Sequence, residues 1–399
     1  MRVYIIAALL VSTLLVSGIS TPANAKVVRW TPVEKTIITT PKGTTGSSKA
    51  FIKEVCAAIK AAPEGAQIQA LTYWSSDDTV LNCLKYAKTT NKVNVSYTTW
   101  DNDYSANKNK NKKALQKLRS ALGTDLSKKS YFKICNDSCL INGAEEGSQH
   151  AKAITISEVV AKNGKRVKNI VFISSGNFSN AAAGKSWNYS NLFVNRPKLY
   201  TGMSDFIKAM KDDKTLKNPI PTVVDGDTTF RFYPDGYEPI APTLAKIKTS
   251  KVPKSYRANE RAVVRVVMYY WMAEFKDVAD QLCRLQGIGV DVAVAIKESS
   301  TGSSIKDVLK GCKDKNGKKT PIPTYNTEVK GRYSHGKVVT LVAKVDSEYK
   351  YVTFAGSVNF TESALIKNTE IGTEQEGSKY FARGARYFDH VKSYSKKLW

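Results

Sequence analysis

The chain has 399 residues, of which 42% are hydrophobic and 10% aromatic, a composition that favours a packed globular protein and excludes a disordered or fibrous one. Its 61 Lys and Arg residues against 35 Asp and Glu residues give a formal net charge of +26. Such an excess attracts polyanions, so we expect contact with nucleic acid, anionic membranes or phosphate-rich wall polymers. Lysines spread over solvated faces for solubility are the alternative explanation of the same charge.

The first 25 residues have the pattern of a secretory signal peptide. Arg2 forms a short positive region, residues 3–16 are mainly apolar, and residues 23–25 read Ala-Asn-Ala, the A-x-A form of a cleavage site. The apolar stretch is short for a membrane-spanning helix, and no later stretch is apolar enough for one. We therefore expect cleavage near Ala25 and a secreted mature protein, with an uncleaved anchor as the alternative.

The six cysteines of an exported chain predict disulfide bonds. One pair, separated by three residues, fits a tight loop bridge. Sequence alone does not fix the connectivity of the others. The pairings that we expect are Cys135 with Cys139, Cys283 with Cys312, and Cys56 with Cys83.

Strand and helix patterns occur in the same order in the two halves of the chain. Each half begins with a buried strand, a helix and a second strand, at 66–74, 77–90 and 92–100 and again at 262–271, 274–289 and 290–297. Each continues with a helix and a short strand, at 112–123 and 130–135 and again at 303–312 and 324–329. Strand–helix–strand units of this kind ordinarily form parallel pairs with a right-handed crossover.

The repeated order predicts an α/β protein of two similar halves, in which mixed sheets are flanked by helices. Prolines and a glycine interrupt the pattern at residues 218–227, so we place the join there. The expected halves are residues 26–222 and 223–399.

Only three histidines are present, and two of them occupy the same setting. His150 and His335 each begin a His-x-Lys sequence that runs into a strand pattern, and a second strand then ends in Ser-x-Asn-aromatic. The spacing from histidine to asparagine is 177 − 150 = 27 residues in the first half and 359 − 335 = 24 in the second. A single histidine of this kind is more often structural, but its repetition with the same partners favours one site built from both halves.

This set of side chains suits the cleavage of a phosphate ester. One imidazole can attack phosphorus while the other protonates the departing oxygen, because imidazole titrates near neutrality. Two lysines and two asparagines can bind the non-bridging oxygens and neutralise charge in the transition state. No metal or cofactor is then needed, and no His or Cys cluster has the spacing of a zinc site.

The paired motifs resemble the two halves of the phospholipase D superfamily, whose signature is H-x-K-x4-D followed by G-S/G-x-N. The resemblance implies a duplicated fold with one active site at the pseudo-twofold interface, and a metal-independent phosphodiesterase that forms a phosphohistidine. It implies His150 as nucleophile and His335 as general acid, assisted by the catalytic lysines. The catalytic lysines that it implies are Lys152 and Lys337. The phosphate-binding residues that it implies are Asn177, Asn359, Ser175 and Ser357. It also implies that Glu370 orients the histidine of the opposite half, and the first-half counterpart of Glu370 is expected to be Ser190.

The chain departs from this signature at three positions. After four intervening residues, Lys152 and Lys337 are followed by Ser157 and Val342 in place of the signature Asp, and Ser174 replaces a Gly in the first half. Tyrosyl-DNA phosphodiesterases, in the same superfamily, also lack this Asp and are active. A pseudoenzyme that only binds polyanions remains the alternative from another functional class.

The substrate is left open by the sequence. Head-group release from a glycerophospholipid is our first choice because the secreted relatives mostly act there, and a nuclease acting on DNA or RNA is the alternative that the charge favours. Aromatic residues expected in loops would suit a lipid interface or base stacking. These residues are Trp74, Trp100, Tyr104, Trp187 and Tyr189. We expect a monomer, with peripheral contact to anionic membranes or wall polymers.

Overall fold

The computed structural model of the protein describes residues 29–101, 112–141 and 147–399. The expected signal peptide and Tyr104 lie outside the described residues. Within the described ranges, no helix combines the length and the apolar character needed to cross a lipid bilayer.

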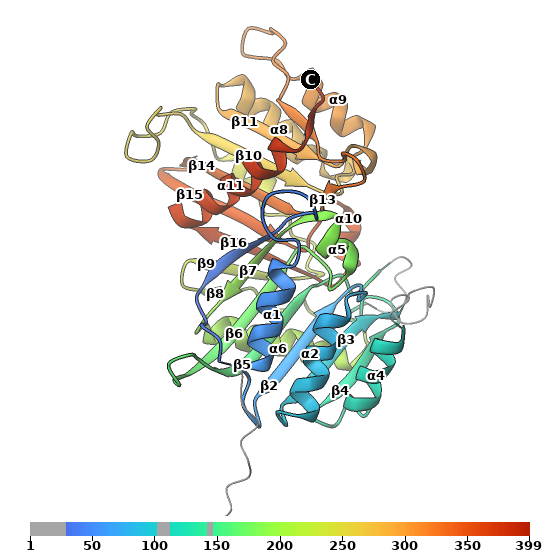
Figure 1. The fold of residues 1–399 in the computed structure, drawn as a ribbon. Coiled ribbons are helices and arrows are strands. Elements are labelled where there is room, and N and C mark those ends of the chain that lie inside the picture. Colours follow the sequence, from blue (N-terminus) through green and yellow to red (C-terminus); the bar gives the residue numbers. More distant parts are fainter. Residues whose placement is uncertain (1–28, 102–111, 142–146) are drawn as a thin grey trace, which may run out of the picture.

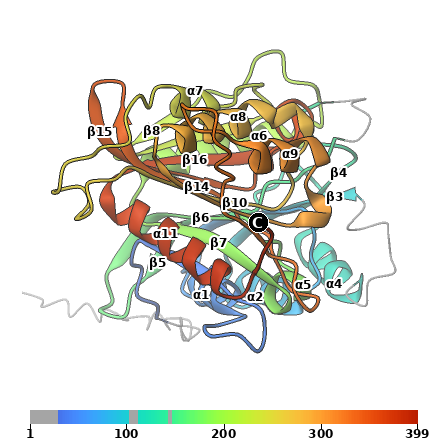
Figure 2. The ribbon, with the colours of Figure 1, turned by 90° about the horizontal axis from the view of Figure 1, so that it is seen from above.

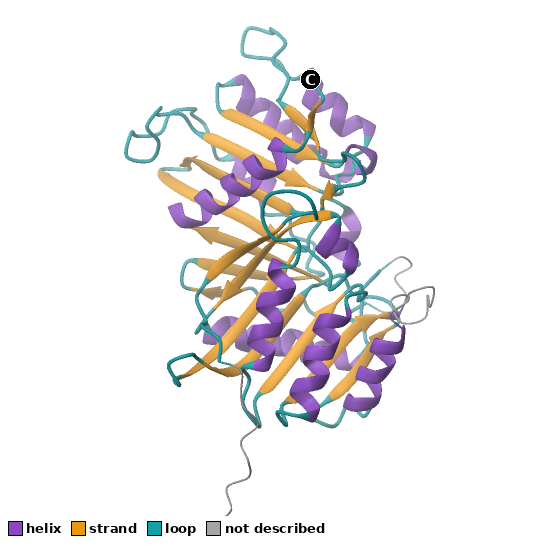
Figure 3. Ribbon diagram, viewed as in Figure 1, coloured by secondary structure: helices purple, strands orange, loops and turns teal. Residues whose placement is uncertain are grey.

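The first half of the chain forms one mixed sheet flanked by helices (Figures 1 and 3). Its strand order is β1-β7-β6-β5-β2-β3-β4, and β13 from the second half joins it beside β7. The strands are β1 (Lys35–Thr39), β2 (Gln67–Thr72), β3 (Asn94–Trp100), β4 (Tyr131–Cys135), β5 (Ala153–Val160), β6 (Arg166–Ser174), β7 (Ser186–Phe193) and β13 (Tyr333–Ser334). The helices are α1 (Ala50–Lys60), α2 (Asp78–Thr89), α4 (Lys112–Leu122), α5 (Asn180–Gly184) and α6 (Pro197–Ala209), followed by the 3-10 turn η1 (Met210–Asp212).

The second half forms a sheet of order β17-β12-β11-β10-β14-β15-β16-β9-β8. Its strands are β8 (Val223–Asp225), β9 (Thr228–Tyr233), β10 (Val263–Met268), β11 (Asp291–Ile296), β12 (Thr324–Asn326), β14 (Lys337–Val345), β15 (Glu348–Gly356), β16 (Glu370–Glu376) and β17 (Lys396–Lys397). Its helices are α7 (Ile240–Ala245), α8 (Lys276–Gly287), α9 (Ser303–Gly311), α10 (Glu362–Ile366) and α11 (Ser378–Ser393), with 3-10 turns η2 (Ala273–Phe275) and η3 (Glu298–Ser300).

The two sheets repeat one strand order. The path β1-β7-β6-β5-β2-β3-β4 of the first sheet corresponds step by step to β9-β16-β15-β14-β10-β11-β12 of the second. The strand–helix–strand units form the expected parallel pairs, β2 with β3 and β10 with β11, and the strand that follows each His-x-Lys motif joins antiparallel. The predicted fold class is confirmed, and the proposed boundary at residues 222 and 223 falls between α6 and β8.

Helices cover the outer faces of both sheets, and the sheets approach each other between them. Figure 2 shows α1, α2 and α4 on one side of the molecule and α7, α8 and α9 on the opposite side. Helix α6 packs on the inner face of the first sheet and α11 on the inner face of the second. A buried cluster with members from β7, β10, β14 and α11 fills part of the space between the halves.

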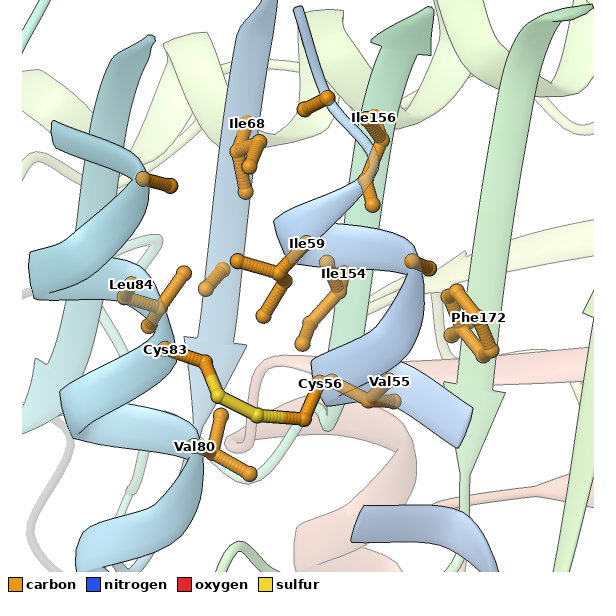
Figure 4. Close-up of a cluster of buried hydrophobic side chains, with 14 of the residues drawn as sticks. Val55, Cys56, Ile59, Ile68, Val80, Cys83, Leu84, Ile154, Ile156 and Phe172 are labelled. Atoms are coloured by element: carbon orange, nitrogen blue, oxygen red, sulfur yellow. A yellow bond between two sulfur atoms is a disulfide. The ribbon is translucent and has the colours of Figure 1, made fainter. Parts of the chain in front are cut away.

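The outer layer of the first half illustrates why these segments fold as they do. Helix α2 is capped at its N-terminus by Asp77, whose carboxylate accepts a hydrogen bond from the Thr79 N–H at 2.8 Å. Its apolar residues recur at helical spacing and are buried in the core of the first half, where α2 packs against α1, α4 and β3 and the Cys56–Cys83 disulfide joins α1 to α2 (Figure 4). The other two expected disulfides, Cys135–Cys139 and Cys283–Cys312, are also present, so all three pairings are confirmed.

Two aromatic residues expected in loops lie in the core instead. Trp187 and Tyr189 belong to β7, are each 1% exposed, and pack against β10, β14 and α11 of the second half. The expectation that they meet a lipid surface or a base is therefore wrong. Their sequence, which alternates with polar residues, resembles a surface segment, but both faces of β7 are covered by other elements.

Candidate active site

Each segment that carries a motif histidine is hydrogen-bonded to the opposite half of the chain. The His150 N–H donates to the Thr369 carbonyl at 2.9 Å, beside β16 of the second half. In the same way, the His335 N–H donates to the Trp187 carbonyl at 2.9 Å, in β7 of the first half. Each histidine is thus held against the opposite half, and these contacts bring His150 and His335 together at the junction.

One cavity of about 390 Å³ lies over this junction. Both motif histidines and both motif asparagines, Asn177 and Asn359, line it. Most of the remaining wall is aromatic, formed by Tyr73, Trp74, Tyr269, Tyr270 and Tyr333. The structure therefore gathers residues from both copies of the motif around a single space.

The motif lysines are buried beneath the histidines. Lys152 is 0% exposed and Lys337 is 3% exposed, and each ammonium donates to the backbone carbonyl of its own motif histidine. Neither ammonium forms a salt bridge with any described residue. Burial lowers the pKa of Lys152 to about 7, although the Glu370 carboxylate opposes this change. Burial, and then the charge of Lys152, also hold the pKa of Lys337 well below its usual value. Two buried cations with one nearby carboxylate make a site that an anion would stabilise.

His150 is paired with a buried carboxylate from the other half. Its Nδ1 lies 2.6 Å from Glu370 Oε1, and Glu370 is 0% exposed. Burial lowers the pKa of His150 to about 4; Glu370 raises it and Lys152 lowers it further. At neutral pH the imidazole is therefore uncharged, and its Nδ1–H donates to the carboxylate. The Nε2 lone pair is then free to act as a nucleophile.

His335 has a different partner. Its Nδ1 lies 2.8 Å from the Ser175 carbonyl, which can only accept, so we assign the proton to Nδ1. The Lys337 ammonium lies 3.1 Å from the same nitrogen and 3.3 Å from Nε2. Burial, followed by the charges of Lys337 and Lys152, holds the pKa of His335 well below its usual value. A phosphate bound between the lysines would offset those charges and favour the protonated ring. The two histidines are thus chemically unequal, one backed by a carboxylate and the other by a neutral carbonyl.

The motif serines do not line the cavity. The Ser175 hydroxyl accepts the Tyr189 N–H, and the Ser357 hydroxyl accepts the Ile371 N–H, each at 3.0 Å. Both serines are 0% exposed and fasten the ends of β6 and β15 to the neighbouring strands. The expectation that Ser175 and Ser357 contact the phosphate is corrected accordingly, because their hydroxyls are engaged by backbone behind the cavity.

The counterpart of Glu370 in the first half is Asn188, not Ser190. The Ser175 N–H donates to the Tyr189 carbonyl, and in the second half the Ser357 N–H donates to the Ile371 carbonyl. Tyr189 and Ile371 therefore occupy the same place in the repeat. The residues directly before them, Asn188 and Glu370, are equivalent for the same reason. Ser190 instead bonds Ser174 within the core. The spacing contained this signal, since 188 − 177 and 370 − 359 both equal 11.

Two tyrosines complete the site and were missed in the sequence. The ring centroid of Tyr73 lies 4.9 Å from that of His150, and the ring centroid of Tyr269 lies 4.5 Å from that of His335. The same rings lie 5.2 Å and 5.1 Å from the ammonium groups of Lys152 and Lys337. Such contacts stabilise a lysine in its charged form. The available signal was an aromatic residue directly after the first strand of each unit.

The missing signature Asp has a simple structural consequence. Ser157 and Val342 lie in β5 and β14, five residues beyond the motif lysines, a distance of about 16 Å along a strand. Ser157 accepts the Gln67 N–H at 2.9 Å, and Val342 is fully buried. Neither lines the cavity, so their presence leaves the residues around it in place.

A glycine between His335 and Lys337 is required by packing. A Cβ at Gly336 would overlap the ring of Tyr387 in α11, whereas the first half carries Ala151 at this position. We expect Gly336→Ala to lower the free energy of unfolding by about 1–3 kcal/mol, the usual cost of overpacking a core. Thermal and urea denaturation would measure this loss, and an unchanged stability would show that α11 yields without cost. The matched change Ala151→Gly should leave the cavity in place.

Comparisons with known proteins bear on the family resemblance and the fold. Residues 257–392 match the family model described as "Cardiolipin synthase, PLD-like domain". The resemblance to the phospholipase D superfamily is confirmed. This PLD-like domain contains His335, Lys337 and Asn359. No curated protein sequence matches the chain significantly.

Solved structures show the same fold over nearly the whole chain. Phosphatidylserine synthase from Haemophilus influenzae aligns with a TM-score of 0.59 and 12% identity, covering 91% of this chain and 87% of that one. Polyphosphate kinase from Porphyromonas gingivalis aligns with a TM-score of 0.53 and 14% identity, covering 94% of this chain. The alignment spans only 49% of that kinase. At these identities the likeness concerns the fold.

Proposed function

We propose that the protein is a secreted, metal-independent phosphodiesterase that acts through a phosphohistidine. The observation that carries this proposal is the cavity lined by two histidines in unequal environments, with two buried lysines beneath those histidines. Ammonium groups that lack a salt-bridge partner among the described residues can supply the positive charge that metal ions provide in other phosphoryl-transfer sites.

In the first step, Nε2 of His150 attacks phosphorus in line with the leaving oxygen. A P–N bond forms, the P–O bond to the leaving group breaks, and His335 Nε2–H gives its proton to the departing oxygen. Glu370 stabilises the positive charge that develops on the His150 ring, because its carboxylate accepts the Nδ1 proton. Lys152, Lys337, Asn177 and Asn359 hold the non-bridging oxygens.

In the second step, a water molecule replaces the leaving group. His335, now unprotonated at Nε2, accepts a proton from this water as its oxygen attacks phosphorus. The P–N bond breaks and returns His150 to its starting state. The products are an alcohol and a phosphomonoester, and both histidines end the cycle as they began it.

Glycerophospholipid is our first choice of substrate, with release of the head group. The matching family model is named for cardiolipin synthase and the H. influenzae structure is a phosphatidylserine synthase, and both names refer to phospholipid synthesis, which supports a lipid phosphodiester. A nuclease is the second candidate. It is favoured by the aromatic wall of the cavity and by Lys297, whose ammonium lies 5.2 Å from the Tyr269 ring and 5.6 Å from the Tyr333 ring.

Export is supported by the signal-peptide pattern and by the three disulfides, which persist in oxidising compartments. Removal of residues 1–25 would take away only Arg2 among the charged residues, leaving a net charge of 26 − 1 = +25. We propose that this charge holds a monomer against anionic membranes or wall polymers outside the cell.

The deciding assay uses the purified protein in excess EDTA, with phosphatidylcholine vesicles and plasmid DNA in parallel. We expect head-group release that persists in EDTA and is absent from His150→Ala, because His150 forms the covalent bond. DNA cleavage alone would move the substrate to nucleic acid. The absence of any His150-dependent product would contradict the enzyme and favour a polyanion-binding protein.

A further inference from the structure

A small disulfide loop lies directly behind the pair formed by His150 and Glu370. The Cys135–Cys139 bridge closes the loop at the end of β4, and its cysteines are 0% and 1% exposed. Cys139 has a φ of 67°, in the left-handed region that disfavours residues with a Cβ. The covalent closure holds the loop in this conformation, and the carbonyls between the cysteines are thereby fixed in direction.

Two of these carbonyls bind the residues next to His150 and Glu370. The Asp137 carbonyl accepts the Gln149 N–H at 3.1 Å. The Ser138 carbonyl accepts the Thr369 hydroxyl. Gln149 and Thr369 come from different halves, pair with each other in a parallel bridge, and are both 0% exposed.

The loop therefore sets the register between two segments that lie far apart in sequence. The His150 N–H to Thr369 carbonyl bond and the Thr369 N–H to Ser148 carbonyl bond are both 2.9 Å long. They place His150 opposite Glu370, so that Nδ1 meets Oε1 at 2.6 Å. A shift of either segment by one residue would turn one of these side chains to the other face.

His335 has no comparable disulfide loop beside it. The connection that leads to His335, residues 327–334, contains no cysteine. The Nδ1 of His335 lies 2.8 Å from the backbone carbonyl of Ser175 and 3.1 Å from the Lys337 ammonium, and no carboxylate of a described residue pairs with it. The disulfide loop is thus found on the side where the histidine depends on a carboxylate supplied by the opposite half.

We propose that the Cys135–Cys139 loop is a positioning element of the active site, which clamps Gln149 and Thr369 and so keeps His150 on Glu370. The role in turnover rests on the function proposed above. The contact itself does not, because the hydrogen bond at Nδ1 can be observed without a substrate.

The test compares Cys135→Ser/Cys139→Ser with the control Cys283→Ser/Cys312→Ser, which opens a bridge between α8 and the end of α9. Protein labelled with ¹⁵N-histidine reports the Nδ1 proton of His150, and Glu370→Gln supplies the reference for loss of the carboxylate that accepts this proton. We expect the loop variant to lose or shift this signal towards that of Glu370→Gln, and the control to keep it. Turnover of bis(p-nitrophenyl) phosphate should fall about 10- to 100-fold in kcat, with KM little changed.

A milder variant keeps the proposal testable if the loop variant does not fold. Thr369→Val removes only the hydroxyl that bonds Ser138, so we expect a smaller shift of the Nδ1 signal and about a 3- to 10-fold fall in kcat. An unchanged signal and a kcat within twofold of the parent in both variants would overturn the proposal. An equal loss in the Cys283/Cys312 control would also overturn it. A shifted Nδ1 signal in a protein without phosphodiesterase activity would uphold the clamp and reject the function.

Discussion

Replacing His335 with Asn should leave the phosphoryl group of the substrate, with its second ester intact, bound covalently to His150. With bis(p-nitrophenyl) phosphate the leaving group needs no proton, so the first step proceeds, but no base is left to activate water for the second. Multiple turnover should fall by about 10²- to 10⁴-fold, the usual contribution of general acid–base catalysis. Stopped-flow release of p-nitrophenol would show one equivalent per protein, and peptide mass spectrometry would place an acid-labile p-nitrophenyl phosphoryl group on His150.

The complementary variant His150→Asn should show neither the burst nor the label, because the nucleophile is missing. Label on His335 in that variant would reverse the two roles. His390, the third histidine, lies half-buried in α11 and outside the cavity lining, so His390→Asn is the matched control and should behave like the parent. A loss of turnover in His390→Asn would indicate that replacing a histidine disturbs folding rather than a catalytic step.

Replacing Lys152 with Met should stabilise the protein while removing phosphate binding. The side chain is 0% exposed, and burial lowers the pKa of Lys152 to about 7. Substituting a buried charge with an apolar side chain of similar size is often neutral or stabilising by about 1–4 kcal/mol. We expect a gain in this range at pH 7, together with the loss of detectable binding of inorganic phosphate by calorimetry.

The pH dependence of this gain follows from the pKa. Below pH 7 Lys152 is protonated in both the folded and the unfolded protein, so the full cost of burying the charge is present. As the pH rises from 7 towards the unfolded pKa of about 10.4, the folded protein no longer carries that charge, and the advantage of Met should disappear. Urea denaturation between pH 6 and 10 measures the difference in the free energy of unfolding between Lys152→Met and the parent protein. The exposed Lys208→Met should change stability by less than about 0.5 kcal/mol throughout. A gain from Lys152→Met that did not vary with pH would contradict burial of the charge as its cause.

The residues of the proposed site could be predicted from the sequence because each of them lies in a short repeated pattern. His150, Lys152 and Asn177 recur as His335, Lys337 and Asn359 within the same order of strands, and apolar periodicity reveals those strands without reference to any distant residue. Strand–helix–strand order fixes parallel pairing and handedness, so the fold class followed from the same patterns.

The surroundings of this set were decided by tertiary structure. The Glu370 carboxylate beside His150, the Ser175 carbonyl beside His335 and the burial of Trp187 all depend on which segments of the opposite half lie nearby. The His150–Glu370 pair joins residues 220 positions apart. Periodicity reports how a residue sits on its own strand, whereas such a contact exists only once the two halves have packed and each histidine segment lies against the opposite half. The sequence by itself therefore determined which groups are available for chemistry, and the packing of one half against the other decided how each is oriented and charged.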